Sequence, residues 1–279
     1  MVGIIDEWWL RLLIGVIGAG LAAAAAYRAR ALSGSGALSA LAMGAGFIAL
    51  GEPIWFACLI AFFISSTAWS KYKKRHRAKA QAEANYEKTG RRDAGQVWAN
   101  GGIGLALCAA DAIWPSAGWL YAFIGVMGAV NADTWATEIG ALSRSAPRSL
   151  LSGKKVAAGT SGAVTALGSA AAFAGAAFIG LVAAWLWPTE TTSASAAAVA
   201  VVAALAGFAG CYADSLLGAT VQAMYRCPKC GAETERTVHC GTKTVPLRGI
   251  AWMNNDRVNM LSSLAAGAIG WALGLLLIG

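Results

Sequence analysis

The stretch NADTWATEIGALSRSAPRSLLSGKKVAAGTSG, residues 131–162, decides the fold because it is a polar break between two long apolar runs. The carboxylates of Asp133 and Glu138 fall near the end of the first run, and basic, glycine-rich residues precede the second. Of the 279 residues in the chain, 57% are hydrophobic and only 13% are charged. This composition excludes a water-soluble globule with a polar shell and predicts an all-α, polytopic membrane protein.

Apolar runs long enough to cross a bilayer core, about 20 residues each, recur on both sides of this break. We predict a bundle of seven or eight transmembrane helices from the segments 7–26, 31–50, 53–70, 97–114, 118–140, 161–187, 194–221 and 258–279. The second and third form a tight hairpin at residues 51–53 and are the weakest of these candidates. The first is interpreted as a retained span and not a signal peptide, because Asp6 and Glu7 precede it and Arg28 and Arg30 follow it.

The basic residues predict the orientation of the bundle. With the N-terminus outside and eight crossings, 21 of the 22 Lys and Arg residues fall in the inner loops 27–30, 71–96, 141–160 and 222–257. Short loops rich in Lys and Arg stay in the cytoplasm. We therefore predict an integral protein of the bacterial inner membrane whose site faces the cytoplasm. The run from Lys71 to Lys79 is expected to meet anionic lipid headgroups, and no nucleic-acid partner is expected.

This pattern divides the chain into three parts. Residues 1–70 form N-terminal transmembrane helices, 71–96 a basic linker, and 97–279 a transmembrane core that includes a small cysteine-containing loop at 222–257. Residues 78–92 are interpreted as a polar surface linker.

Three predicted spans begin at the inner face with polar sequences: GQVWANGG at 95–102, GKKVAAGTSG at 153–162 and MNNDRVN at 253–259. The free amides and positive dipole of a helix N-terminus favour an anion, and glycine lets the backbone approach it closely. The predicted phosphate- or nucleotide-binding residues are Asn100, Gly101, Gly102, Gly159, Thr160, Ser161, Gly162, Asn254, Asn255 and Asp256, with Lys154 and Lys155 as point charges. Close helix packing or capping by these residues is the alternative.

The carboxylates of Asp133, Glu138 and Asp214 are the candidate ligands of a magnesium ion. Ionisable side chains at membrane depth are costly, and Mg²⁺ typically binds one or two carboxylates together with water and phosphate oxygens. Asp133 and Glu138 are five residues apart, about 140° around a helix, so they would not share an ion without a break in the helix. A buried carboxylate paired with Lys or Arg is the alternative. Asp111, at the far end of its span, is interpreted as structural.

The loop 222–257 contains CPKCGAETERTVHCG, which supplies Cys227, Cys230, His239 and Cys240. Thiolate and imidazole ligands are typical of a structural zinc site, and the cytoplasm keeps thiols reduced. Because His239 and Cys240 are neighbours, it is open whether both reach one metal. A metal-free loop and a redox pair are the alternatives.

Other common catalytic patterns are missing from the sequence. The residues 152–155 lack the glycine spacing of a GxxxxGK[ST] phosphate-binding loop and a preceding strand. Both histidines, His76 and His239, fall in polar loops. No histidine base or other strong nucleophile is therefore expected.

The motifs RRDAGQVWANGG, NADTWATEIG, SGKKVAAGTSGAVTALG, ADSLLGATVQ and WMNNDRVNMLSS occur in this order. Together they resemble the transmembrane protein 19 family, also called the domain of unknown function 92 family, whose plant members include phytyl-phosphate kinase. The resemblance covers Arg91 to about Ser263. The cysteine-bearing segment 227–248 departs from the pattern expected in the eukaryotic relatives, so nothing is carried over to it.

The resemblance implies a membrane kinase that transfers a phosphoryl group from a nucleoside triphosphate, by analogy CTP, to an isoprenyl monophosphate such as phytyl or geranylgeranyl phosphate. It implies that Asp133, Glu138 and Asp214 hold Mg²⁺, while Lys154 and Lys155 bind phosphate. The isoprenyl tail would lie between spans, along surfaces rich in Ala and Gly. A transporter of a lipid phosphate or small anionic solute is the alternative, although it would place its key charges near the midplane.

Overall fold

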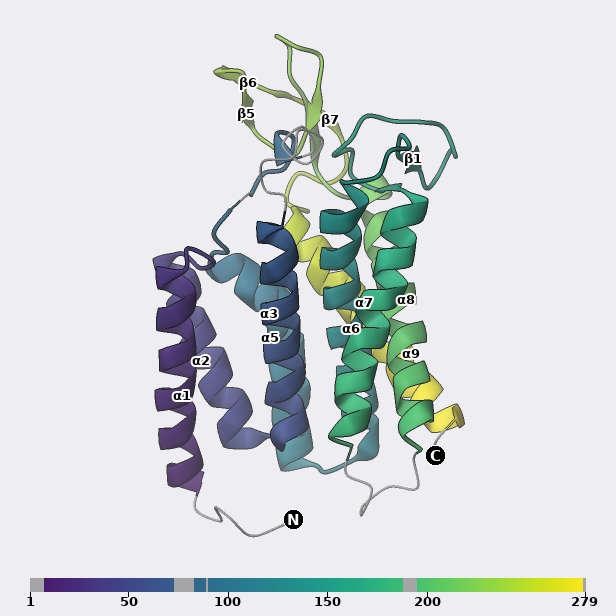
Figure 1. Cartoon of the computed structure of the whole chain (residues 1–279). Coiled ribbons are helices and arrows are strands. Elements are labelled where there is room, and N and C mark those ends of the chain that lie inside the picture. Colours follow the sequence, from purple (N-terminus) through teal and green to yellow (C-terminus); the bar gives the residue numbers. More distant parts are fainter. Residues whose placement is uncertain (1–7, 73–82, 89, 188–194, 278–279) are drawn as a thin grey trace.

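The computed structural model describes residues 8–72, 83–88, 90–187 and 195–277, and eight helices dominate them (Figure 1). These are α1 (Trp8–Arg28), α2 (Gly34–Leu50), α3 (Pro53–Lys71), α5 (Ala94–Ile113), α6 (Ala117–Gly140), α7 (Ala166–Trp185), α8 (Ala196–Thr220) and α9 (Asn255–Leu277). Each corresponds to one predicted segment. The predicted helical membrane bundle is therefore confirmed.

Five helices, α1, α3, α7, α8 and α9, are long and apolar enough to cross a membrane by length and composition. Helix α2 is apolar but shorter, with 17 residues. Helix α6 carries more polar side chains, and its position explains why the fold tolerates them. It packs against α3, α5, α7, α8 and α9, and it is buried without interruption from Leu120 to Ala132. Protein, rather than lipid, therefore surrounds most of α6.

Small residues let α6 and α9 approach each other closely. A Cβ on Gly125 would lie 2.5 Å from the carbonyl oxygen of Ala266, and one on Gly270 would lie 2.5 Å from that of Tyr121. Glycine at such crossings is a common packing device in membrane helices. The Gly-rich C-terminal span thus serves the central packing of the bundle.

Short strands gather at one end of the bundle, opposite the labelled N- and C-termini (Figure 1). Strands β1 (Arg148–Ser149) and β2 (Ala163–Val164) pair antiparallel, as do β5 (Val238–His239) and β6 (Thr242–Lys243). Strands β3 (Met224–Arg226), β4 (Glu233–Thr234) and β7 (Val245–Arg248) form an antiparallel sheet in the order β4-β3-β7. We call this end, which carries the Lys- and Arg-rich loops, the basic end. The basic run at 73–79 lies outside the described residues.

Two sequence expectations need correction at the basic end. Helix α7 begins at Ala166 and not at 161, because Gly162 has a φ of 77°, β2 follows it, and the Thr165 side chain accepts a hydrogen bond from the Gly168 amide as the helix cap. The segment 222–257 is not a plain loop, because β3–β7 form a small β unit within it. We call residues 222–250 the β unit.

Candidate functional site

A cavity of about 270 Å³ lies at the basic end, between the ends of α5, α6, α8 and α9, residues 83–92, the turn 160–163 and the β unit. Carboxylates from separate parts of the chain line it: Glu83, Glu87, Asp133, Glu138, Asp214, Glu235 and Asp256. Lys88 and Arg92 are its lining Lys and Arg residues among those described. We call it the acidic cavity, because its carboxylates outnumber these cations and would attract a metal ion.

Two of the three carboxylates predicted to bind magnesium, Asp133 and Asp214, lie inside the bundle, whereas Glu138 is two residues from the end of α6. Asp133 lies seven residues before Gly140, where α6 ends, and Asp214 lies six before Thr220, where α8 ends. At 1.5 Å per residue, both are about 10 Å from the helix end. Asn259 of α9 lines the same cavity, and its buried Oδ1 has no hydrogen-bond partner among the described residues. A buried acceptor of this kind calls for a ligand, such as a cation or a donor group.

Glu138 and Asp133 both line the acidic cavity, although five residues separate them along α6. Helix α6 continues unbroken between them. The hydroxyl of Ser70 in α3 donates a hydrogen bond of 2.5 Å to Glu138. In α8, Asp214 Oδ2 accepts a hydrogen bond of 2.9 Å from Ser262 Oγ. Asp133 and Asp214 are better placed than Glu138 to share one ion, because they lie at a similar depth in the bundle and Glu138 lies nearer its helix end.

Lys88 fastens the segment before α5 to the start of α9. Its Nζ forms an ion pair of 3.0 Å with the carboxylate of Asp93 and a second, closer one with Asp256. Burial lowers the pKa of Lys88, but the hydrogen bonds and charges of Asp256 and Asp93 outweigh burial and raise it. Lys88 is therefore a cation whose ion pairs hold the start of α5 and the start of α9 together beside the acidic cavity.

Glu235 of the β unit connects three segments around the acidic cavity. Gln222 Nε2 donates to Glu235 Oε1 at 2.9 Å, and Ser161 Oγ donates to Gln222 Oε1 at 2.7 Å. The backbone amide of Glu87 donates to Glu235 Oε2 at 3.1 Å. Burial, followed by the charges of Glu235, Glu138 and Asp133, raises the pKa of Tyr86. The Tyr86 hydroxyl therefore remains a hydrogen-bond donor beside these carboxylates.

A second cavity, of about 430 Å³, lies next to the acidic cavity. It is lined by the turns 143–147 and 156–160, by Tyr212 of α8 and by Thr165 and Gly168 at the start of α7. The residues that line both cavities include Tyr86, Asp133, Thr137, Thr160 and Ser215. We call it the loop cavity. Arg144 and the positive N-terminal end of α7 make it suitable for an anion.

A third cavity, of about 70 Å³, lies among α1, α2, α3 and α5 and is lined mainly by Ala, Leu, Ile, Met and Phe side chains. We call it the apolar cavity. Arg92, Gln96 and Asn100 line both it and the acidic cavity. The Arg92 guanidinium lies 5.5 and 5.8 Å from the ring centroids of Phe62 and Phe63. Burial lowers the pKa of Arg92, opposed by the charge of Glu138, yet arginine stays protonated in proteins. A fixed cation therefore marks the boundary between the two cavities.

The structure brings together most of the residues predicted from the sequence. The members that line the acidic cavity are Asn100, Asp133, Glu138, Thr160, Ser161, Gly162, Asp214, Asn255 and Asp256. Gly159 lines the loop cavity instead. The three motifs at the starts of α5, α7 and α9 therefore do converge on one region.

Other predicted residues lie elsewhere. Lys154 and Lys155 are exposed in the turn between β1 and β2 and line none of the three cavities. Gly101 and Gly102 lie inside α5, where a Cβ on them would meet Met43 and Trp98. Asn254 is used as a helix cap, since its Oδ1 accepts from the Arg257 amide at 3.2 Å.

Sequence reasoning missed Tyr86, Lys88, Arg92 and Glu235. It interpreted 78–92 as a surface linker, whereas the described part of this segment lies over the acidic cavity. Arg236 Nε donates to the carbonyl oxygen of Tyr86 at 2.7 Å, which ties the segment to the β unit. Arg92 belongs to the quoted motif RRDAGQVWANGG and was within reach of the sequence argument. Glu235 carried no local signal, because only the tertiary fold brings it to the cavity.

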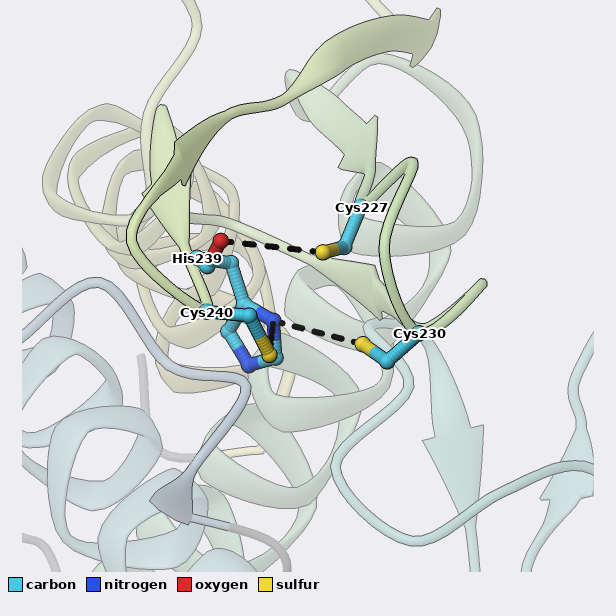
Figure 2. A group of neighbouring side chains, drawn as sticks. All are labelled: Cys227, Cys230, His239 and Cys240. Atoms are coloured by element: carbon cyan, nitrogen blue, oxygen red, sulfur yellow. Dashed lines mark hydrogen bonds between the residues drawn. The ribbon is translucent and has the colours of Figure 1, made fainter.

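The four zinc-ligand candidates of the β unit also come together. The ligand atoms of Cys227, Cys230, His239 and Cys240 all lie within 4.8 Å of one another (Figure 2). None of the four lines the acidic or the loop cavity.

Gly162 tolerates a side chain poorly. Its φ is 77°, and an added Cβ would lie 2.4 Å from the Cβ of Ala219 in α8. We expect Gly162→Ala to lower the free energy of unfolding by about 2–4 kcal/mol, from backbone strain and overpacking together. Gly153→Ala is the matched control, since Gly153 has a φ of 66° but nothing within 4 Å of its Cβ position. Thermal unfolding in detergent measures both, and equal losses would show that the Ala219 contact is unimportant.

The family model described as integral membrane protein DUF92 matches residues 17–267. The chain is 29% identical over 276 residues to Protein PGR of Arabidopsis thaliana, covering 91% of this chain and 93% of that protein. It is 26% identical over 265 residues to the uncharacterized membrane protein MJ0933 of Methanocaldococcus jannaschii, covering 95% and 94%. No solved structure matches. With a helical membrane bundle and a family model that spans most of its length, the chain belongs to the DUF92 family of integral membrane proteins.

Proposed function

We propose that the protein is a membrane kinase that transfers a phosphoryl group from a nucleoside triphosphate to an isoprenyl monophosphate. One observation carries this proposal, namely the order of the three cavities. The apolar cavity adjoins the acidic cavity at Arg92, Gln96 and Asn100, and the acidic cavity adjoins the loop cavity at Asp133, Thr160 and Ser215. This order suits a lipid tail, a lipid phosphate with its metal ion, and a nucleotide, respectively.

The acceptor lipid would straddle the boundary marked by Arg92. The apolar cavity, at about 70 Å³, would hold the part of an isoprenyl chain next to the phosphate against aliphatic and aromatic walls that include Met43, Phe56 and Leu59, and the rest of the chain would lie between the helices. The Arg92 guanidinium would bind the phosphate, since arginine binds phosphate through two parallel hydrogen bonds. This assignment replaces Lys154 and Lys155, which lie away from the cavities. Phytyl and geranylgeranyl phosphate are the acceptors that the family resemblance favours.

The acidic cavity fits a magnesium ion. Asp133 and Asp214 supply carboxylate oxygens, and Asn259 supplies the buried amide oxygen that has no hydrogen-bond partner among the described residues. Mg²⁺ prefers oxygen ligands of this kind and takes its remaining ligands from water and phosphate. When bound, the ion would neutralise charge that develops on the transferred phosphoryl group. The Ser70 hydroxyl donates a hydrogen bond to Glu138, and the negative charge of Glu138 would help to orient the Arg92 guanidinium.

The nucleotide would occupy the loop cavity. Arg144 and the N-terminus of α7 would bind phosphate oxygens there, and Tyr212 lines the wall. The Tyr212 hydroxyl lies 2.7 Å from Ser169 Oγ, so both hydroxyls are held in place. CTP is the donor suggested by the family resemblance. Any preference for one nucleobase would come from contacts with the wall of the loop cavity that contains Tyr212.

The proposed reaction needs no strong protein base. An oxygen of the lipid phosphate forms a bond to the γ-phosphorus while the bond from that phosphorus to the β–γ bridging oxygen breaks. The products are an isoprenyl diphosphate and a nucleoside diphosphate. The second pKa of a phosphate monoester is about 6, so the acceptor is already largely dianionic at neutral pH. Positioning and charge neutralisation supply most of the catalysis in such transfers.

The loops rich in Lys and Arg favour a cytoplasmic location for the basic end, because such loops are retained there during insertion. The site would then face the cytoplasmic pool of nucleoside triphosphates. In a bacterium, this corresponds to the cytoplasmic face of the inner membrane.

The test is a kinase assay on the purified protein in detergent. Phytyl and geranylgeranyl monophosphate are offered with each γ-labelled nucleoside triphosphate, with Mg²⁺ or with EDTA. We expect magnesium-dependent label in an isoprenyl diphosphate, fastest with CTP. No transfer from any donor by folded protein would overturn the proposal. In that case, uptake of isoprenyl phosphate by proteoliposomes would test the transporter alternative.

A further inference from the structure

Residues 227–248, which make up most of the β unit, have almost no hydrophobic core of their own. Between residues 227 and 248, only Cys227 and Thr234 are buried, and Val238 and Val245 are each 56% exposed. Its strands are two to four residues long. So small a unit normally needs a disulfide or a metal to hold one conformation. No disulfide occurs among the described residues, and all six cysteines are free thiols.

Two turns present the four candidate ligands to one another. In the first, the Gly231 amide donates to the Cys227 carbonyl oxygen and the Cys227 amide donates to that of Ala232, both at 2.9 Å. This turn directs Cys227 and Cys230 to one side. The second turn joins β5 to β6 and carries His239 and Cys240. Figure 2 shows the side chains of the two turns facing each other.

The backbone explains how neighbouring residues reach the same point. Cys240 has a φ of 51° and Gly241 a φ of 73°, values typical of the two central residues of a type I′ hairpin turn. A left-handed conformation costs a non-glycine residue about 1–2 kcal/mol. Such a conformation persists where surrounding interactions demand it, often at a functional site. Here it turns the Cys240 thiol back toward the imidazole of its neighbour.

The distances match a tetrahedral metal site. The His239 Nδ1 atom lies 3.5 Å from Cys230 Sγ and 3.3 Å from Cys240 Sγ. Zinc bonds of about 2.3 Å to sulfur and 2.0 Å to nitrogen place neighbouring tetrahedral ligands about 3.5–3.8 Å apart. All four ligand atoms lie within 4.8 Å of one another, so no pair has to approach by more than about 1 Å to reach this spacing. Three cysteines and one histidine form a complete tetrahedral set, which is typical of structural and not catalytic zinc.

We propose that Cys227, Cys230, His239 and Cys240 bind one structural Zn²⁺ that holds the β unit in its folded conformation. The ion links the turn before β4 to the turn after β5. The residues between these two turns include Glu235, which lines the acidic cavity, and residues that contact the segment 85–87. Thr234 Oγ1 donates to the Asn85 carbonyl oxygen at 2.8 Å, and Glu235 and Arg236 hold residues 86 and 87. Zinc therefore fixes the wall of the acidic cavity without lining it. This inference stands independently of the proposed kinase activity.

The test begins with the metal content of the full-length protein, purified in detergent without chelators and measured by mass spectrometry. We expect about one zinc per chain. Cys230→Ser and Cys240→Ser, which change exposed side chains, should lower that content at least tenfold. Lys229→Ser, within the same turn as Cys230, and Cys108→Ala, a cysteine buried in α5, are the matched controls and should keep the zinc.

A second readout keeps the proposal falsifiable if a variant fails to fold. Removing zinc from the wild-type protein with a strong chelator should open residues 227–248 to a protease, and added Zn²⁺ should restore protection. Substitution by Co²⁺ should produce the strong visible absorption of tetrahedral thiolate coordination. Wild-type protein that contains no zinc and does not take it up, or a Cys240→Ser variant that keeps wild-type zinc, would overturn the proposal. Iron in place of zinc would overturn it as well.

Discussion

Asp214→Asn should lower the rate of phosphoryl transfer by more than about 100-fold while leaving the fold intact. Loss of a residue that merely supports a metal ligand costs about 10–100-fold in activity, so loss of a ligand itself should cost more. Asparagine has nearly the same shape as aspartate, and its Oδ1 can still accept the hydrogen bond from Ser262 Oγ, which spans 2.9 Å to Asp214. The rate at saturating substrate, measured over a range of Mg²⁺ concentrations, gives the effect.

Asp111→Asn is the matched control for this experiment. Asp111 lies near the opposite end of α5, where its Oδ1 accepts a hydrogen bond from the Ser116 amide at 3.1 Å, and asparagine can accept the same bond. It should transfer phosphate at the wild-type rate. If Asp214→Asn were equally active, with an unchanged magnesium requirement, the proposed metal site would be wrong.

Arg92→Met should raise the KM for the isoprenyl phosphate by about 10- to 150-fold. This range corresponds to loss of one hydrogen-bonded charge interaction of about 1.5–3 kcal/mol. Methionine keeps an unbranched apolar side chain that can still pack on Phe62 and Phe63, so the apolar cavity should survive. The KM for the nucleotide should change little, because Arg92 lines the acidic and apolar cavities and not the loop cavity.

Arg91→Met is the control for loss of a positive charge at the neighbouring position. The Arg91 guanidinium lies 6.0 Å from the ring centroid of Tyr27, and Arg91 lines none of the three cavities. Steady-state kinetics with both substrates varied should separate the two variants. Equal KM values for isoprenyl phosphate in Arg91→Met and Arg92→Met would contradict the assigned phosphate site. So would a rise in the nucleotide KM alone.

Hydropathy predicted the helices well, because eight apolar segments of sufficient length leave few alternatives for a chain in a membrane. The boundaries were less predictable. At the start of α7 hydropathy does not separate Gly162 from the apolar residues that follow it, and the positive φ of that glycine and the Thr165 cap delay the helix. Helix caps and glycine conformations depend on contacts that hydropathy does not record.

The candidate site was predicted unevenly, for a physical reason. Asp133 and Asp214 stood out because a carboxylate within an apolar span is costly and needs a purpose. Lys154 and Lys155 were predicted to bind phosphate but lie in an exposed turn, because a basic pair beside glycines has the same sequence pattern in an exposed turn as in a phosphate site. Glu235 reaches the acidic cavity only through the folding of the β unit. Such long-range contacts carry no local sequence pattern.

The most direct test of the cavity order is photo-crosslinking with a geranylgeranyl phosphate that carries a diazirine in its chain. The purified protein is labelled in detergent with Mg²⁺, with and without excess unlabelled geranylgeranyl phosphate, and the labelled peptides are mapped by mass spectrometry. We predict displaceable labelling within residues 34–71, which include the α2 and α3 walls of the apolar cavity. Labelling confined to α7 and α8, or labelling that the unlabelled lipid does not displace, would contradict the account.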